Sequence, residues 1–193
     1  MTHEFILLLC TAYLLGSVSF AVLLSQLVQQ PDPRRFGSGN PGASNMLRLG
    51  RRRLALATLI GDCGKGALAV WLARYLGLDP VDQAWIGLAV IVGHILPVYY
   101  RFQGGKGVAT AGGVLLILSW PAAAVAVLTW LTVFAIRGIS SLAALTACVL
   151  VLPWLAWHSP ELQLPVSLMV LLIVLSHRVN IGRLLAGNEQ RFR

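Results

Sequence analysis

The sequence predicts an all-α protein with seven transmembrane helices, and two observations indicate this class. Hydrophobic residues make up 57% of the chain and charged residues only 11%, and the mean hydropathy is +0.76, far from the composition of soluble domains. The apolar residues also gather into runs near the length of about 20 residues that a helix needs to cross a bilayer. We therefore expect one integral membrane domain over residues 1–193, with no separate soluble domain.

The first apolar run covers residues 5–28 and is expected to stay in the membrane as an anchor. No lysine or arginine precedes it, and no small-residue cleavage pattern follows it, as a removable signal peptide would require. Pro31-Asp32-Pro33 marks its end, because proline cannot continue a helix.

Five more apolar runs follow, separated by polar or proline-containing turns, and they cover residues 54–78, 84–100, 108–136, 142–157 and 162–176. The run 108–136 is too long for one span and contains Ser119-Trp120-Pro121 near its middle. We therefore expect two short helices there, the fourth and fifth of the protein, each shorter than a full crossing unless the bilayer thins or neighbouring helices shield it.

Lysine and arginine decide the predicted orientation, because they accumulate in cytoplasmic loops. With the amino terminus outside, the loops that contain Arg48 and Lys106 lie inside, and seven crossings also place the carboxyl terminus in the cytoplasm. The tail arginines then lie inside as well: Arg178, Arg183, Arg191 and Arg193. The alternative is one long kinked span over 108–136, which gives six helices and an outward tail.

The net charge of +8 would suggest a nucleic-acid partner in a soluble protein. In this chain topology accounts for the excess of basic residues, so no nucleic-acid partner is expected.

Three polar stretches fall on one predicted membrane face. The first runs from Ser38 to Asn45 and includes Asn40, Gly42 and Ser44, with Arg48 shortly after it. Its hydroxyl, amide and backbone donors suit an anion such as phosphate. A simple turn between two spans is the alternative for this stretch taken alone.

The second stretch is Gly104-Gly105-Lys106-Gly107, directly before a predicted helix that begins at Val108. Glycines let backbone N–H groups approach a ligand, and a helix amino terminus favours an anion, so this loop suits phosphate. A tight turn with a topology-setting lysine is the alternative. The residue after Lys106 is glycine rather than serine or threonine, so the loop is not a Walker A motif and nucleotide hydrolysis is disfavoured.

The third stretch contains His177, Asn180 and Arg183 at three-residue intervals, which a helix would bring to one face, and Glu189 follows. Histidine can transfer a proton near neutral pH, although a histidine that only caps a helix is an equal alternative. We interpret the remaining intramembrane histidine, His94, as a packed and hydrogen-bonded residue.

Asp62 and Lys65 lie well inside the second predicted helix. An unpaired charge at such depth costs at least about 2.5 to 3.5 kcal/mol, so we expect them to pair or to line a wet cavity. Function is the favoured explanation for this pair, and a purely structural role is the alternative.

In order and spacing, SGNPGASN with Arg48, GGKGVAT and HRVNIGRLLAGNE resemble the three cytoplasmic motifs of the acyl-phosphate-dependent glycerol-3-phosphate acyltransferases, the PlsY family. This family more often has threonine at the position of Ser44. The resemblance implies a multi-pass enzyme of the bacterial inner membrane with its active site on the cytoplasmic face. It would transfer a fatty acyl group from acyl phosphate to the 1-position of sn-glycerol 3-phosphate, giving lysophosphatidic acid and phosphate in the first step of phospholipid synthesis.

The resemblance also implies roles for individual residues. Gly104, Gly105, Lys106 and Gly107 would hold glycerol 3-phosphate, and the catalytic positions would be Ser38, Arg48, His177 and Asn180. The resemblance further adds Ser141 and gives Glu189 a structural role. From the residues themselves we assign Asn40, Gly42, Ser44, Asn45 and Lys65, with Ser141, to acyl phosphate or a second phosphate, and Asp62 to a structural role.

The expected partners are glycerol 3-phosphate, long-chain acyl phosphate and membrane lipids, and no cofactor or metal is expected. None of the four histidines has an aspartate five residues later, so the motif of acyl-CoA-dependent glycerolipid acyltransferases is missing. The proton acceptor is left open between His177 and the phosphate of the substrate. The rival functions are a transporter for a phosphorylated anion, which would need a polar path to both membrane faces, and a protein without catalysis.

Overall fold

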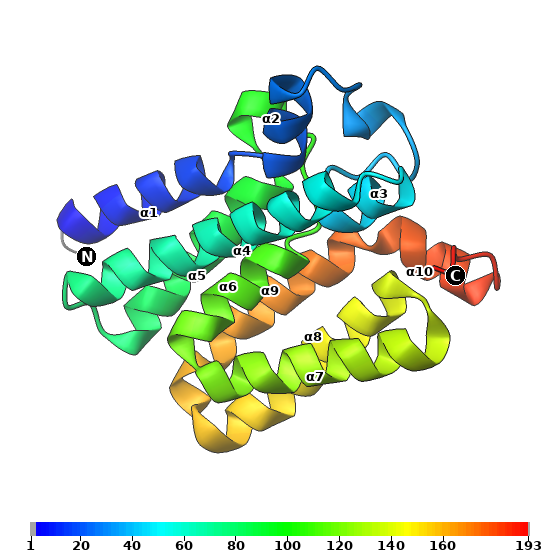
Figure 1. Ribbon diagram of the computed structural model, residues 1–193. Helices are drawn as coiled ribbons and strands as arrows, with labels where there is room; N and C mark the ends of the chain where they lie inside the picture. The colour runs from blue at the N-terminus through cyan, green and yellow to red at the C-terminus, as the bar shows by residue number, and fades with distance from the viewer. Residues whose placement is uncertain (1–2, 193) are drawn as a thin grey trace.

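A computed structural model describes residues 3–192, and every regular element within this range is helical (Figure 1). The predicted all-α class is therefore confirmed. The outer boundaries of the expected domain, 1 and 193, and the tail residue Arg193 lie outside the described residues. The longer helices run side by side, and the two ends of the chain lie at opposite ends of the bundle (Figure 1).

The helices follow the predicted apolar runs, with short helices in the connecting loops. The α-helices are α1 His3–Gly16, α2 Phe20–Leu27, α3 Ala43–Arg48, α4 Arg52–Tyr75, α5 Pro80–Ile95, α6 Val108–Leu118, α7 Trp120–Arg137, α8 Ser140–His158, α9 Gln163–Ser176 and α10 Arg178–Leu185. Single 3₁₀ turns occur at η1 Pro33–Arg35, η2 Val98–Tyr100 and η3 Pro160–Leu162. Helices α7 and α8 form a hairpin along one side of the bundle (Figure 1).

Four helices within residues 3–192 are long and apolar enough to cross a membrane by themselves: α4, α5 with η2, α7 and α8. The bent pairs α1 with α2 and η3–α9 with α10 raise this number to six if each pair is one span. Helix α6 is apolar but has only 11 residues. The expectation that the fourth and fifth helices are both short holds for α6 and is wrong for α7, whose 18 residues suffice by length and composition.

The first apolar run is not one helix, contrary to expectation. It breaks between α1 and α2, which meet at an angle of 48°. The break frees the carbonyl group of Val18, and the ammonium Nζ of Lys65 on α4 donates a hydrogen bond to it at 2.6 Å. Because an unsatisfied backbone group in apolar surroundings is costly, this distant lysine makes the break tolerable.

The second break lies at Ser119, between α6 and α7, as the sequence predicts. It is stabilised in the same way, since the guanidinium group of Arg74 near the end of α4 donates to the carbonyl oxygen of Ile117. Arg74 is itself held by Gln83, whose Oε1 accepts a bond from Nε at 3.2 Å.

Helices α4 and α6 approach each other closely enough for their backbones to touch. A Cβ atom at Gly66 would overlap the carbonyl of Thr110, and one at Gly113 would overlap the carbonyl of Cys63. Glycine at a helix interface permits this approach, which is common between membrane helices. The contact fixes α6, and thus the loop before it, against the part of α4 that carries Asp62.

The predicted pair of Asp62 and Lys65 is confirmed. Lys65 Nζ lies 3.0 Å from Asp62 Oδ1, and both side chains are almost fully buried. At this depth the two charges compensate each other, and removing only one of them leaves the other unpaired.

The substitution Lys65→Met should therefore lower the free energy of unfolding by about 3–5 kcal/mol, because it leaves a buried carboxylate without its cation. The double variant Lys65→Met/Asp62→Asn should lose less stability, since both charges are removed together. Thermal unfolding in detergent measures the difference, with Leu56→Met on the exposed side of α4 as the control. A double variant no more stable than Lys65→Met would contradict the explanation.

Candidate active site

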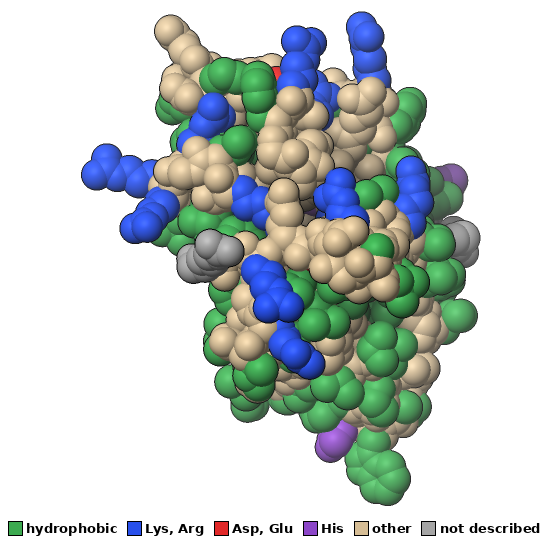
Figure 2. All heavy atoms as spheres, turned by 90° about the vertical axis from the view of Figure 1, so that its right-hand side faces the viewer, with side chains coloured by type: hydrophobic (Ala, Val, Ile, Leu, Met, Phe, Trp, Pro, Cys, Tyr) green, Lys and Arg blue, Asp and Glu red, His purple; other side chains and the backbone are tan. Residues whose placement is uncertain are grey.

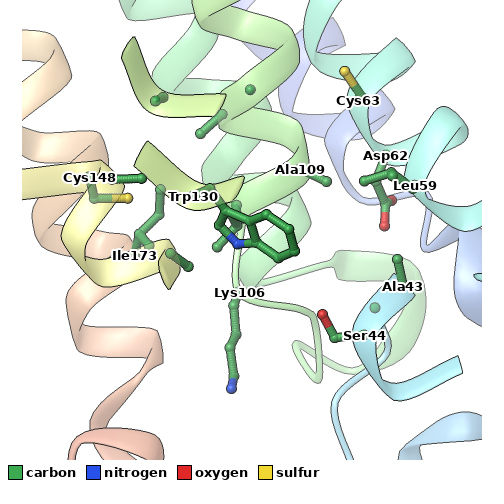
Figure 3. A pocket seen from close by; sticks show the side chains of 18 of the residues that line it. Ala43, Ser44, Leu59, Asp62, Cys63, Lys106, Ala109, Trp130, Cys148 and Ile173 are labelled. Atoms are coloured by element: carbon green, nitrogen blue, oxygen red, sulfur yellow. The ribbon is translucent and has the colours of Figure 1, made fainter. Parts of the chain in front are cut away.

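Two neighbouring cavities lie at the end of the bundle where the polar stretches meet. The larger has a volume of about 780 Å³ and extends between α4, α6, α7, α8 and α9. Its walls there are mainly apolar, and Trp130, Ala109, Cys148 and Ile173 surround it from several helices (Figure 3). The shape suits a long apolar ligand.

The smaller cavity has a volume of about 200 Å³ and polar walls. It is lined by Ser38, Gly39, Asn40, Gly104, Lys106, Ser176, Val179, Asn180 and Arg183. Four of these residues line the larger cavity too: Ser38, Asn40, Lys106 and Asn180. A charged headgroup and an apolar tail can therefore be bound next to each other.

The structure brings together most of the residues that the sequence singles out. Thirteen of them line one or both cavities: Ser38, Asn40, Gly42, Ser44, Asn45, Arg48, Asp62, Gly104, Lys106, Gly107, Ser141, His177 and Asn180. The exceptions are Lys65, Gly105 and Glu189. Lys65 is turned to Val18 and Asp62, and its ammonium donates to the former and pairs with the latter. Its assignment to substrate binding does not fit this position.

Asn45 folds the first polar stretch. Its Oδ1 accepts a hydrogen bond from the backbone N–H of Ser38 at 2.8 Å, and its Nδ2 donates to the carbonyl oxygens of Pro33 and Phe36 at 2.9 and 3.1 Å. The side chain is fully buried and uses its donors and acceptor on the turn. Asn45 therefore positions Ser38 at the cavities.

Arg48 is the last residue of α3 and lines the larger cavity. Its guanidinium group lies over the ring of Phe192, 4.8 Å from the ring centre, so the carboxyl-terminal segment holds it in place. Burial lowers the pKa of Arg48, with Glu189 opposing this shift and Arg183 adding to it. The first stretch is also tied to α8, because the hydroxyl groups of Ser44 and Ser140 lie 3.0 Å apart.

The glycine loop leads directly into α6. Gly107 has a φ of +81°, which favours glycine, and α6 begins at Val108 as predicted. The first N–H groups of a helix lack partners inside it, so this end can receive an anion. The Gly105 N–H, in contrast, donates to the carbonyl of His94 at 3.0 Å and is not available to a ligand.

His177 lies in the joint between α9 and α10, outside both helices. Its Nδ1 lies 2.8 Å from the carbonyl oxygen of Ile173, which can only accept, so Nδ1 carries the hydrogen and Nε2 carries the lone pair. Burial lowers the pKa of His177 to about 4; the Ile173 carbonyl and Glu189 oppose the shift, and the Lys106 charge adds to it. His177 is therefore neutral near pH 7.

A chain of hydrogen bonds joins the second and third stretches to α8. Lys106 Nζ donates to Asn180 Oδ1, and Asn180 Nδ2 donates to Glu189 Oε1 at 2.6 Å. The Ser141 hydroxyl donates to the same carboxylate oxygen at 2.7 Å. Glu189 thus orients Asn180 and Ser141 from outside the cavities, which agrees with the structural role expected for it.

Lys106 is a cation with a perturbed pKa. Burial lowers its pKa to about 8, the charge of Glu189 opposes this shift, and Arg48 and Arg183 add to it. At pH 7 most of the ammonium is charged, and a bound anion would stabilise that form further.

Sequence reasoning gave no role to Ser140, to Ser176 at the start of the third stretch, or to the apolar wall. Ser140 precedes the assigned Ser141 and faces Ser44 instead of Glu189. The Ser176 hydroxyl lies 2.7 Å from the carbonyl oxygen of Ile173 and 3.2 Å from that of Lys106, so its one hydrogen is shared between α9 and the glycine loop. The two adjacent serines at the start of α8 could have suggested Ser140. The apolar residues of the cavity wall cannot be recognised from the sequence, because they do not differ from those of any other membrane-spanning helix.

Basic side chains gather on the face above the cavities. Figure 2 views the end of the bundle that lies on the right of Figure 1, near α3 and α10, and lysine and arginine side chains are spread widely over it. Within residues 3–192 no group of three or more His, Cys, Asp or Glu side chains is placed to hold a metal ion.

Comparison with known proteins finds close similarity over nearly the whole chain. A family model described as glycerol-3-phosphate acyltransferase matches residues 6–187. A protein of Pseudomonas entomophila strain L48, named glycerol-3-phosphate acyltransferase, is 56% identical over 181 residues, which cover 94% of this chain and 96% of the relative. A protein of the same name from Pseudomonas syringae pv. tomato strain DC3000 is 56% identical over 192 residues and the full length of both.

Two solved structures are also similar. The crystal structure of PlsY (YgiH), an integral membrane glycerol 3-phosphate acyltransferase, in its glycerol 3-phosphate form has a TM-score of 0.92 and 36% identity, and covers 98% of this chain and 96% of that one. Its lysophosphatidic acid form has a TM-score of 0.90, 35% identity and the same coverage.

Replacing Glu189 should lower the pKa of Lys106 below about 8, because Glu189 supplies the negative charge that raises it. An amine reacts in its neutral form, so the labelling of Lys106 by an amine reagent should increase at lower pH in Glu189→Gln than in the unaltered protein. Peptide mass spectrometry over a pH series measures the midpoint. Ser141→Ala, which leaves the carboxylate charge in place, is the control, and equal midpoints in Glu189→Gln and the unaltered protein would contradict the assignment.

Proposed function

Because the chain belongs to the glycerol-3-phosphate acyltransferase family, we propose that it transfers a fatty acyl group from acyl phosphate to the 1-hydroxyl of sn-glycerol 3-phosphate. The products are lysophosphatidic acid and inorganic phosphate. The observation that carries this proposal is the pair of adjoining cavities, one small and cationic and one large and apolar, with Lys106 and Asn180 in the wall of both.

The smaller cavity binds glycerol 3-phosphate. Lys106 and Arg183 supply positive charge, Ser38 and Asn180 supply hydrogen-bonding groups, and Gly104 lets the ligand approach the backbone. Charge-assisted hydrogen bonds of about 1.5–3 kcal/mol each make three such contacts sufficient for micromolar to millimolar binding. Gly105 contributes by shaping the loop, since its N–H is used on His94.

The larger cavity binds the acyl phosphate, with the acyl chain between the helices and the phosphate at the polar end. Arg48 and Lys106 are cations at that end, and Asn40, Gly42, Ser44 and Ser141 also line this cavity. Asn45 and Glu189 act through the residues that they orient. Asp62 and Lys65 serve the framework.

The reaction needs alignment more than activation, because phosphate is already a good leaving group. The glycerol oxygen attacks the carbonyl carbon of the acyl phosphate, the new ester C–O bond forms, and the bond from that carbon to the phosphate oxygen breaks. Positive charge from Arg48 and Lys106 stabilises the developing oxyanion and the departing phosphate.

The proton of the attacking hydroxyl goes to the phosphate of glycerol 3-phosphate. His177 has a pKa of about 4, which makes it a weaker base than a phosphate monoester, whose second pKa is about 6. The lone pair on His177 Nε2 still accepts a hydrogen bond from the hydroxyl and directs it toward the carbonyl carbon.

Residues 1–193 form one domain, which lies in the bacterial inner membrane. It crosses the membrane seven times, with the amino terminus outside and the carboxyl terminus in the cytoplasm. The basic face around the cavities supports this orientation, since positive charge favours the cytoplasmic side (Figure 2). The reaction then begins phospholipid synthesis at the inner leaflet, where the lipid product can enter the bilayer directly.

The acyl donor can be tested with protein purified in detergent. With glycerol 3-phosphate and acyl phosphate, we expect lysophosphatidic acid and one phosphate per turnover, and with acyl-CoA no product. Lys106→Ala protein is the control for contaminating enzymes, since loss of the ammonium should raise KM for glycerol 3-phosphate about tenfold or more. Equal rates with acyl-CoA would refute the proposed donor.

His177→Ala should reduce kcat by about 100-fold, because a misaligned hydroxyl loses much of the benefit of proximity. The decline of activity at low pH should remain in the variant, since it reports protonation of the substrate phosphate near pH 6. Rate profiles from pH 5 to pH 8 measure this. If the acid limb disappears with the imidazole, His177 is the base.

A further inference from the structure

A buried cluster of three ionisable side chains lies next to the glycine loop and has no role in the reaction described above. Asp62 Oδ1 lies 3.0 Å from Lys65 Nζ and 3.5 Å from His94 Nδ1, so one carboxylate oxygen faces both partners. The His94 side chain is 6% exposed. Asp62 and His94 also line the larger cavity, whereas Lys65 points away toward Val18.

His94 contacts the glycine loop directly. Its carbonyl oxygen accepts the Gly105 N–H at 3.0 Å, and a Cβ atom at Gly105 would overlap Nε2 of its ring. A Cβ atom at Gly104 would overlap the carbonyl oxygens of His94 and Ile95. Both glycines therefore lie against the end of α5, and the next residue in the chain is Lys106.

The cluster sets the orientation of the His94 ring. Nδ1 of the ring faces Asp62 Oδ1 at 3.5 Å, an ion-pair contact without a hydrogen bond, and Nε2 is turned toward Gly105. Lys65 compensates the charge of Asp62, which lets the carboxylate remain ionised in apolar surroundings. The ring then has one preferred position, and the loop packs on it.

Packing alone does not explain these residue types. Apolar side chains of similar volume could fill the same space without the desolvation cost of three ionisable groups. The charged cluster adds a preferred orientation for the His94 ring, which lies between α4 and the glycine loop. Lys106 of this loop lines the smaller cavity.

We propose that Asp62 and His94 are positioning residues for glycerol 3-phosphate binding: they hold the glycine loop against the end of α5 so that Lys106 enters the smaller cavity. This inference rests on the proposed function, because it takes that cavity as the glycerol 3-phosphate site. It goes beyond a structural role for Asp62 and gives His94 a part in substrate binding.

The test is a double-mutant cycle between His94 and Gly105 with both Michaelis constants measured. His94→Ala and Gly105→Ala should each raise KM for glycerol 3-phosphate about tenfold or more, since a displacement of 1 Å can cost up to about 100-fold. They should raise KM for acyl phosphate less, because Arg48 also lines the larger cavity. In the double variant the new methyl group enters space that the ring has left, so KM should be closer to the unaltered value than the product of the two single effects.

Two further variants test whether the intact imidazole of His94 is needed. His94→Asn keeps a donor near the position of Nδ1 and removes most of the ring, whereas His94→Leu keeps bulk and removes the donor. Both should raise KM for glycerol 3-phosphate selectively, and they carry the test if His94→Ala does not fold. His158→Ala, at the end of α8 and exposed, is the matched control and should leave both constants unchanged.

Equal rises in the two Michaelis constants, or single effects that simply multiply in the double variant, would overturn the inference. These outcomes differ from failure of the proposed function. In that case the unaltered protein releases no phosphate from acyl phosphate, and no variant is needed to show it.

Discussion

Every carbonyl group that a helix break exposes in an apolar bundle must find a donor, and this requirement organises the structure. Lys65 satisfies Val18 where α1 meets α2, and Arg74 satisfies Ile117 where α6 meets α7. Each donor comes from a distant part of the chain, so the breaks are held by tertiary contacts. The same contacts help to set the positions of α4 and α6, which form part of the wall of the larger cavity.

Much of the fold can be predicted from the sequence, because hydropathy and length determine where helices cross a membrane. The break at Ser119 was visible because Pro121 follows it closely, and a proline favours the start of a helix. The break between α1 and α2 was not, since no proline marks it and the residues around Val18 are as apolar or small as those of a continuous span. Its partner Lys65 lies 47 positions away, a relation that periodicity along the chain does not show.

The sequence predicts which residues form the candidate site more accurately than it predicts where their polar groups point. Phosphate-like ligands need cations, hydroxyl groups and glycines, so the three stretches stand out in a chain this apolar. Which way each polar group points depends on its partner: the Asn45 side chain turns to its own loop, the Gly105 N–H to the His94 carbonyl, and the Lys65 side chain to the first helix break. The neighbouring Ser140 and Ser141 face Ser44 and Glu189 respectively, because successive helical residues point in different directions.

The wall that the two cavities share has a thermodynamic consequence. Lys106 and Asn180 are hydrogen-bonded to each other and line both spaces, so an occupant of one space alters groups that an occupant of the other must meet. By linkage, whatever factor the first ligand imposes on the affinity of the second is returned by the second to the first. The affinity measured for a ligand or inhibitor of one cavity therefore depends on whether the other cavity is occupied. The same holds for the order in which the two ligands bind and for competition by dead-end analogues.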